Sequence, residues 1–273
     1  MSAHVGRVRP PMTAGRLLAA ARRSLPIVVT AIVILSGWQL TVRLLEVPSF
    51  ILPAPSMIAS ALGAELSTIL SASRITVQAV LAGLVIGAAA GVLVALVISR
   101  FRRISAPVLS VAVIINCAPI VALAPIFNNW FGVTSLVSKV GVAAVMVFFP
   151  VMVNTTRGLL LVSPLHLEIM ESLAAWPRQI STLLRLPNAL PYLFNALKLG
   201  ATQSVIGVIV TEYFGGPSNA LGVYIAQQAS LPRFPEAWAG ILVACLLGLT
   251  LFGLVSLLER LIMPWHESTR GES

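Results

Sequence analysis

The sequence of 273 residues has few charged side chains and no aspartate. Charged residues make up 10% of the chain, all nine acidic residues are glutamates, and 58% of the residues are apolar. A soluble domain contains about 25% charged residues, so this composition excludes a soluble globular domain as well as a disordered chain. It predicts a membrane protein that crosses the bilayer several times.

The same absences exclude several functions. Nucleotide-hydrolysing sites commonly hold magnesium through an aspartate, and the chain has neither an aspartate nor a G-x-x-x-x-G-K-[ST] loop. None of its three histidines lies in an apolar run, which excludes an intramembrane H-E-x-x-H zinc protease and a histidine-assisted serine protease. Cys117 and Cys245 lack zinc-ligand spacing and are expected to be free thiols. We therefore expect no enzymatic activity, no metal and no cofactor in this chain.

Six apolar runs are long enough to cross a bilayer, which takes about 20 residues as a helix. We expect an all-α membrane protein with a transmembrane domain over residues 25–263 and tails at 1–24 and 264–273. The first run is too long for a signal peptide and lacks a nearby cleavage site. The predicted spans are 25–45, 75–99, 106–128, 136–160, 192–214 and 237–263.

Basic residues are distributed unevenly between the two sides of these spans. Thirteen arginines lie on one side, in or next to the two tails and the segments after the second and fourth spans, against four basic residues on the opposite side. Because Lys and Arg are concentrated in cytoplasmic loops, both termini are expected in the cytoplasm. The net charge of +9 is therefore a feature of topology, and no nucleic-acid partner is expected.

The longest predicted cytoplasmic segment, residues 163–191, contains a short amphipathic helix. Ser163 can cap it and Pro164 suits its first turn, and Glu168 and Glu171 lie off its apolar face. Such a helix either rests on the membrane surface, where basic residues usually line the polar face, or docks onto a soluble partner. Pro177 is expected to end or bend this helix, and Leu186-Pro187 and Pro191 to break the chain before the fifth span. The apolar face is predicted from residues spaced three or four apart, namely Leu165, Ile169, Leu173 and Trp176.

Small and helix-breaking residues mark the second and third spans. Gly83, Gly87 and Gly91 share one helix face, which favours close helix packing either within the chain or at a subunit interface. In the third span, Pro119 and Pro125 are expected to kink the helix. Asn116 and Asn128 beside them could line a polar path or satisfy the carbonyl groups that the prolines free.

Polar residues in the fifth span are functional candidates because ionisable groups are costly inside a membrane. Lys198 is expected to extend toward the interface, with a functional role as the alternative. Gln203 and Ser204, together with Asn116, are candidates for a translocation pathway. Glu212, near the outer end, is a further pathway candidate that caps a gate, contacts a docking protein or reaches interfacial water.

The 163–191 segment resembles the EAA loop of permeases from binding-protein-dependent ABC importers. That motif reads E-A-A, three residues, G, nine residues and I-x-L-P. Glu168 takes the glutamate position, Ala174 the glycine position, and Leu186-Pro187 match its end. Three further stretches resemble the nitrate/sulfonate/taurine group of these permeases, namely L-P-A-P-S at 52–56, the region 119–132 and the region 212–222. Together with the loop, the similarity extends over residues 25–263.

The resemblance implies a type I importer permease in a bacterial plasma membrane. Two such subunits, expected to be a homodimer, would surround a pathway, and an extracytoplasmic solute-binding protein would deliver the solute. A cytoplasmic ATPase would bind and hydrolyse ATP. The residues expected to couple the permease to that ATPase are Glu168, Glu171, Ala174, Trp176, Leu186 and Pro187.

The sequence leaves the geometry of the turn after the loop helix and the class of solute undetermined. Alanine lacks the freedom of glycine to adopt a positive φ, so Ala174 leaves the geometry of the turn after the loop helix undetermined. The group transports heterocyclic vitamin precursors such as pyrimidines as well as sulfonates, and both solute classes fit. The alternatives are a secondary transporter, for which Glu212 is the candidate carboxylate, and an assembly protein that uses the glycine face.

Overall fold

The computed structural model describes residues 14–116 and 122–264, and over these residues it contains helices and turns but no strand. The all-α prediction is therefore confirmed for the described chain. Asn116 ends a helix but its side chain is not described, and Cys117 and Pro119 lie outside the described residues. The helices are α1 (Ala14–Leu44), α2 (Pro55–Arg100), α3 (Arg102–Asn116), α4 (Leu123–Phe131), α5 (Leu136–Leu160), α6 (Pro164–Ser172), α7 (Pro177–Gln179), the π-helical segment η2 (Ile180–Arg185), α8 (Leu186–Tyr213), α9 (Leu221–Ser230) and α10 (Phe234–Ile262).

Five helices in the described residues are long and apolar enough to cross a membrane. They are the 25–44 part of α1, α2, α5, the helix that continues through 177–213, and α10. The predicted third span, 106–128, includes residues that lie outside the described chain, and the structure shows α3 and α4 on either side of them. Pro125 lies in the first turn of α4, where its missing N–H leaves no hydrogen bond unmade.

Several helices extend beyond the predicted spans. α1 begins at Ala14, within the residues predicted as the N-terminal tail, and α2 begins at Pro55, twenty residues before the predicted second span. At 1.5 Å per residue, the 46 residues of α2 extend for about 69 Å. The hydrocarbon core of a bilayer is about 30 Å thick, so α2 projects well beyond it.

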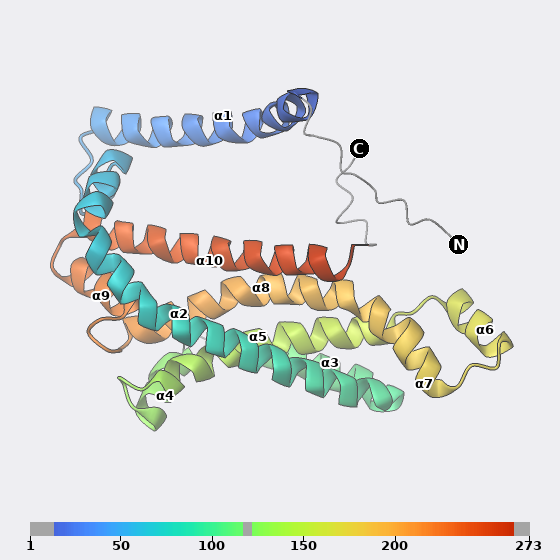
Figure 1. The fold of residues 1–273 in the computed structure, drawn as a ribbon. Helices are drawn as coiled ribbons and strands as arrows, with labels where there is room; N and C mark the ends of the chain where they lie inside the picture. Colours follow the sequence, from blue (N-terminus) through green and yellow to red (C-terminus); the bar gives the residue numbers. More distant parts are fainter. Residues whose placement is uncertain (1–13, 117–121, 265–273) are drawn as a thin grey trace, which may run out of the picture.

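The centre of the bundle is formed by α2, α5 and α8, with α10 packed alongside α8 (Figure 1). Gly83, Gly87 and Gly91 of α2 face α5 of the same chain, and a Cβ atom at any of them would lie closer than 3.0 Å to an α5 atom. The glycines therefore allow the two backbones to approach each other. Next to this contact, buried Val80, Ala143 and Val208 belong to one apolar core.

Helix α1 lies apart from the other helices along most of its length (Figure 1). Its apolar side chains between Leu25 and Leu35 are exposed. It is attached near its C-terminal end, where the Gln39 side-chain amide exchanges hydrogen bonds of 3.0 and 3.1 Å with Ser56. The Trp38 and Trp238 rings also meet there, 5.7 Å apart.

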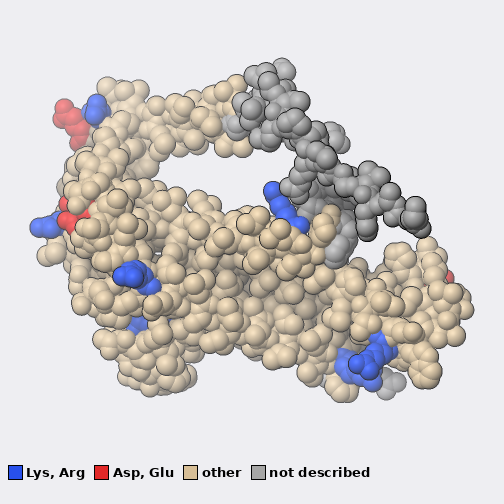
Figure 2. Space-filling view, viewed as in Figure 1, with Lys and Arg blue, Asp and Glu red and all other residues tan. Residues whose placement is uncertain are grey.

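The bundle has two distinct ends, which we call the α6 end and the α9 end. α6 and α7 project at one end, and α4 and α9 lie at the other (Figure 1). Few charged side chains interrupt the surface between them on the face drawn in Figure 2. Both ends contain residues that the sequence marks as functional candidates.

Candidate functional site

The loop helix α6 begins as the sequence predicts but is shorter than expected. Pro164 occupies its first turn, whereas the Ser163 side chain makes no capping hydrogen bond within the described chain. The helix ends at Ser172, so the prediction of one continuous stripe through Leu173 and Trp176 is wrong. The chain leaves the helix at this point because it turns at Ala174.

Ala174 adopts the left-handed conformation, with φ of +51°. Its N–H donates to the Glu171 carbonyl at 2.9 Å, and the Ala175 N–H donates to the Met170 carbonyl at 2.9 Å. These two bonds form a Schellman motif, in which glycine usually holds the left-handed position. The turn therefore forms with alanine, at a conformational cost of about 1–2 kcal/mol.

After this turn the chain enters one uninterrupted helix. Pro177 begins α7, and the helix continues through η2 and α8 to Tyr213. The prediction that Leu186-Pro187 and Pro191 break the chain is therefore wrong. The π-helical turn Ile180–Arg185 ends two positions before Pro187, and such a widened turn accommodates the carbonyl that the proline ring would otherwise strike.

This loop projects from one end of the bundle (Figure 1), and its exposed side chains are both apolar and acidic. Glu168 and Glu171 are exposed, and the Trp176 side chain is 75% exposed. The loop is fixed at its base by Asn188, whose amide donates to the Gly158 and Leu161 carbonyls at 2.7 and 3.1 Å. The other apolar side chains exposed on the loop are Leu165, Ile169, Leu173, Leu183 and Leu186.

At the α9 end, Glu212 is buried and fully engaged. The Thr76 hydroxyl contacts its two carboxylate oxygens at 3.0 and 2.9 Å, and the Gly222 N–H donates to it at 2.8 Å. Thr76 in turn accepts a bond from the Leu221 N–H at 3.0 Å. Leu221 and Gly222 begin α9, where N–H groups lack helical partners and the helix dipole favours negative charge. Glu212 and Thr76 therefore hold the start of α9 against α2 and α8.

A second set of buried polar side chains supports this arrangement. Asn128 of α4 donates to the Thr211 carbonyl at 3.1 Å and to the Gly215 carbonyl at 3.4 Å, so it satisfies carbonyl groups of α8 and the following turn. Lys139 is 2% exposed, donates to the Val133 carbonyl and is attracted electrostatically to Glu212. Lys139 lies within the first turns of α5, at the end of the helix that adjoins α4.

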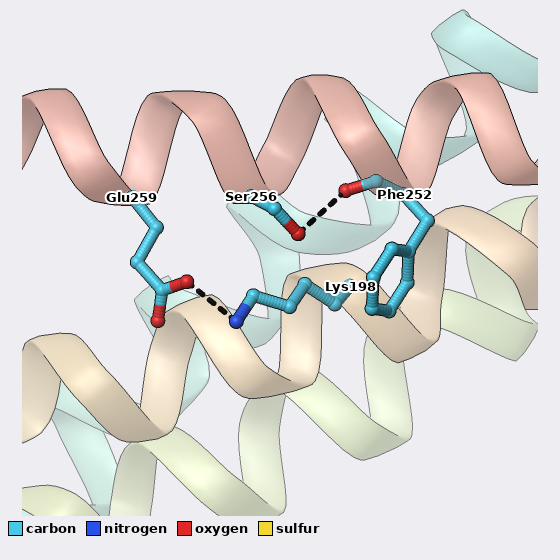
Figure 3. Close-up of polar contacts among 4 residues, drawn as sticks. All are labelled: Lys198, Phe252, Ser256 and Glu259. Atoms are coloured by element: carbon cyan, nitrogen blue, oxygen red, sulfur yellow. Dashed lines mark hydrogen bonds and ion pairs between the residues drawn. The ribbon is translucent and has the colours of Figure 1, made fainter. Parts of the chain in front are cut away.

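Lys198 forms an ion pair that the sequence analysis does not anticipate. Its ammonium group lies 2.5 Å from the Glu259 carboxylate of α10 (Figure 3). The side chains are 17% and 6% exposed, respectively. Lys198 thus reaches across to α10 instead of extending toward the interface. A lysine within a membrane span usually pairs with an opposite charge at a similar depth. A search of the other spans for such a carboxylate would have identified Glu259.

The remaining pathway candidates occupy different surroundings. Ser204 is fully buried and donates to the Ala201 carbonyl at 2.8 Å. Gln203 instead lines a cavity of about 230 Å³ between α3, α5 and α8, together with Asn154 and Arg157. Glu212 borders a cavity of about 490 Å³ beside α9. The structure therefore does not bring the predicted pathway residues together in one place.

This arrangement of long apolar helices with an exposed loop helix at one end is that of an integral membrane protein. The family described as binding-protein-dependent transport system inner membrane component matches residues 83–264. The chain belongs to this family, whose members are the permease subunits of type I ABC importers and function with an ATPase and a solute-binding protein.

Individual relatives are similar over most of the chain and transport different solutes. The formylaminopyrimidine transport permease protein ThiX of Halalkalibacterium halodurans is 29% identical over 84% of this chain and 91% of its own length. The riboflavin transport system permease protein RibX of Chloroflexus aurantiacus is 30% identical over 88% and 90%, respectively. The putative aliphatic sulfonates transport permease protein SsuC of Bacillus subtilis is 29% identical over 88% and 87%. These relatives are transport permeases.

Proposed function

We propose that this chain is the permease subunit of an ATP-driven importer for a small organic solute or anion, and that the α6 loop couples it to the ATPase. The loop residues Glu168, Ala174 and Pro187 keep the spacing of the EAA motif. The observation that carries the proposal is the exposure of Leu173 and Trp176 beside Glu168 and Glu171. An apolar and acidic surface of this kind suits the groove of a protein partner better than a membrane surface.

In this proposal the chain itself does not catalyse a reaction, and a partner subunit binds and hydrolyses ATP. Both termini and the α6 end lie in the cytoplasm, and the α9 end faces the solute-binding protein. Four arginines near the α6 end support this orientation, since positive residues favour the cytoplasmic side. They are Arg100, Arg157, Arg178 and Arg185.

A second copy of the chain completes the permease. The exposed apolar side chains of α1 between Leu25 and Leu35 support an assembly in which lipid and a second subunit cover them. The solute is a heterocyclic vitamin precursor or a sulfonate, since relatives of similar identity carry names of both kinds. A secondary transporter would need a free carboxylate within the membrane, whereas Glu212 and Glu259 are each engaged by partners.

The test of this function is co-purification with an ATPase. The tagged chain, expressed with its neighbouring genes and extracted in mild detergent, is expected to retain a stoichiometric ATPase subunit. Glu168→Arg should reduce retention at least tenfold, because it reverses the charge of the exposed loop face. Glu65→Arg at the opposite end is the matched control and should retain the ATPase.

Two results would contradict the proposal. A wild-type chain that purifies without any ATPase would favour the secondary transporter. Equal retention by the Glu168→Arg and wild-type chains would remove the loop from the contact. Membrane insertion of each variant, measured by its yield in the membrane fraction, separates a lost contact from a lost protein.

A further inference from the structure

The cavity beside Gln203 contains polar groups without internal partners. Arg157 and Gln203 make no side-chain hydrogen bond or ion pair with any described residue, and Asn154 uses only its amide nitrogen, which donates to the Pro150 carbonyl at 2.8 Å. Polar groups between membrane-spanning helices are costly unless they are satisfied. Arg157 is exposed, whereas Asn154 and Gln203 are half-buried. The groups of these side chains that lack internal partners therefore bind solvent or a solute that enters the cavity.

The position of these residues follows from helix geometry. Pro150, Val153, Asn154 and Arg157 are spaced so that they share one face of α5, and Leu199 and Gln203 share the facing surface of α8. Gln203 lies ten residues before the end of α8 at Tyr213, or about 15 Å into the helix. Gln203 is therefore well inside the bundle, whereas Arg157 lies in the last turn of α5. The cavity thus connects the interior of the bundle with its α6 end.

The size and charge of the cavity restrict what it can hold. A water molecule occupies about 30 Å³ in the liquid, so about 230 Å³ has room for about eight waters or one small solute. Of the described residues that line it, one is cationic and none is acidic. A guanidinium group binds the planar or tetrahedral oxygens of an oxyanion with paired hydrogen bonds, and cationic side chains select anions in pores.

We propose that this cavity is an anion subsite in which Arg157, Gln203 and the Asn154 side-chain oxygen contact a small solute with a sulfonate or carboxylate group on its way to the α6 end. Arg157 binds the anionic group. Gln203 and Asn154 bind its uncharged polar atoms. The inference rests on the proposed import function, and it assigns to the solute a negative charge that the family match leaves open.

Thiol-reactive probes of opposite charge test the subsite without knowledge of the solute. Gln203→Cys is introduced into the full chain with Cys117→Ala and Cys245→Ala, and the protein is placed in phosphatidylcholine nanodiscs. It is then treated with 2-sulfonatoethyl or 2-(trimethylammonium)ethyl methanethiosulfonate. Each reagent forms a disulfide with the cysteine thiolate and releases methanesulfinate. Ser230→Cys, beside the cavity at the α9 end, is the matched control.

The sulfonate reagent is expected to react with Gln203→Cys about tenfold faster than the ammonium reagent, relative to the control, because Arg157 attracts it. Arg157→Gln should abolish this preference, and Arg157→Lys should keep most of it. Asn154→Cys repeats the measurement from the α5 side if the first cysteine variant does not fold. Equal rates for both reagents, or a preference that Arg157→Gln leaves unchanged, would overturn the proposal.

Two further arms separate the possible sources of an anion. Phosphatidylglycerol in the nanodiscs should leave the preference unchanged, and its loss would assign Arg157 to a lipid headgroup and overturn the solute assignment. Non-reactive ethanesulfonate should slow the labelling of Gln203→Cys but not of Ser230→Cys, and equal slowing at both would count against a subsite. If the labelling preference is absent but the chain still co-purifies with an ATPase, only the anion subsite is contradicted. If the chain does not co-purify with an ATPase, the proposed import function is contradicted.

Discussion

The two ends of the helix bundle treat their polar groups in opposite ways. At the α9 end, Glu212 is 1% exposed, and partners from α2 and α9 surround its carboxylate. At the α6 end, Glu168 and Glu171 are exposed next to the large apolar side chain of Trp176. Carboxylates of the same chemistry thus fix one end within the chain and are left free at the other. The comparison indicates that the α9 end is stabilised by internal contacts, whereas the α6 end is shaped for contact with another molecule.

The most direct test of this difference between the two ends is to remove one carboxylate from each of them. Glu212→Ala is expected to lower the free energy of unfolding by about 3 kcal/mol, because it leaves buried Lys139 and the first N–H groups of α9 without their anionic partner. Glu168→Ala should change it by less than about 0.5 kcal/mol, as is usual for an exposed residue. Chemical unfolding in detergent, followed by tryptophan fluorescence, measures both. Similar losses for the two variants would show that the ends do not differ in this way.

The turn after α6 provides a second test of this difference, because Ala174 is not the residue type that best suits its left-handed conformation. Ala174→Gly is expected to stabilise the loop by about 1 kcal/mol, since glycine adopts positive φ without steric cost. Amide hydrogen exchange in residues 164–176 should then slow about fivefold. Ala175→Gly is the matched control and should not slow exchange, because Ala175 does not have a positive φ. Faster exchange in Ala174→Gly would contradict the assigned turn.

A smaller effect is expected on the stability of the folded chain at high pH, through Tyr224 at the α9 end. Burial, with Glu65 and Glu236 adding to it and Arg233 opposing it, raises the pKa of Tyr224 to about 12 from its ordinary 10.0. The folded state therefore favours the neutral phenol. This contribution to stability is complete below pH 10 and is lost as the pH rises from 10 to about 12.

Tyr224→Phe isolates this effect because the Tyr224 hydroxyl has no hydrogen-bond partner among the described residues. The Tm of the wild-type chain should fall more steeply between pH 10 and 12 than that of the variant, while the two curves run parallel between pH 7 and 9. Parallel curves over the whole range would show that Tyr224 is not buried in its neutral form.

Much of the fold could be predicted because hydrophobic runs locate helices. The span predicted over 136–160 coincides with α5, and that over 237–263 differs from α10 by three residues at its start. The errors lie where a helix continues past its apolar run, as α2 does toward Pro55 and as α8 does toward Pro177. Hydropathy reports which residues avoid water. It does not report where the backbone hydrogen bonds of a helix begin and end.

The candidate sites were less predictable because they depend on contacts between residues far apart in the sequence. The spacing that marks Glu168 and Ala174 is local, so the sequence could identify the loop. Thr76 and Glu212 are separated by 136 residues, and no local pattern pairs them. Lys198 and Glu259 lie on different spans, so no local pattern pairs them either.

The uninterrupted helix from Pro177 to Tyr213 also has a mechanical consequence. Its first residue adjoins the loop at one end of the bundle, and its next-to-last residue, Glu212, lies at the other end. A single continuous helix therefore joins the two ends. At 1.5 Å per residue, Pro177 and Glu212 are separated by about 52 Å along this helix. A displacement of the loop along the helix axis would therefore also displace Glu212 and, through its hydrogen bond to Gly222, the start of α9.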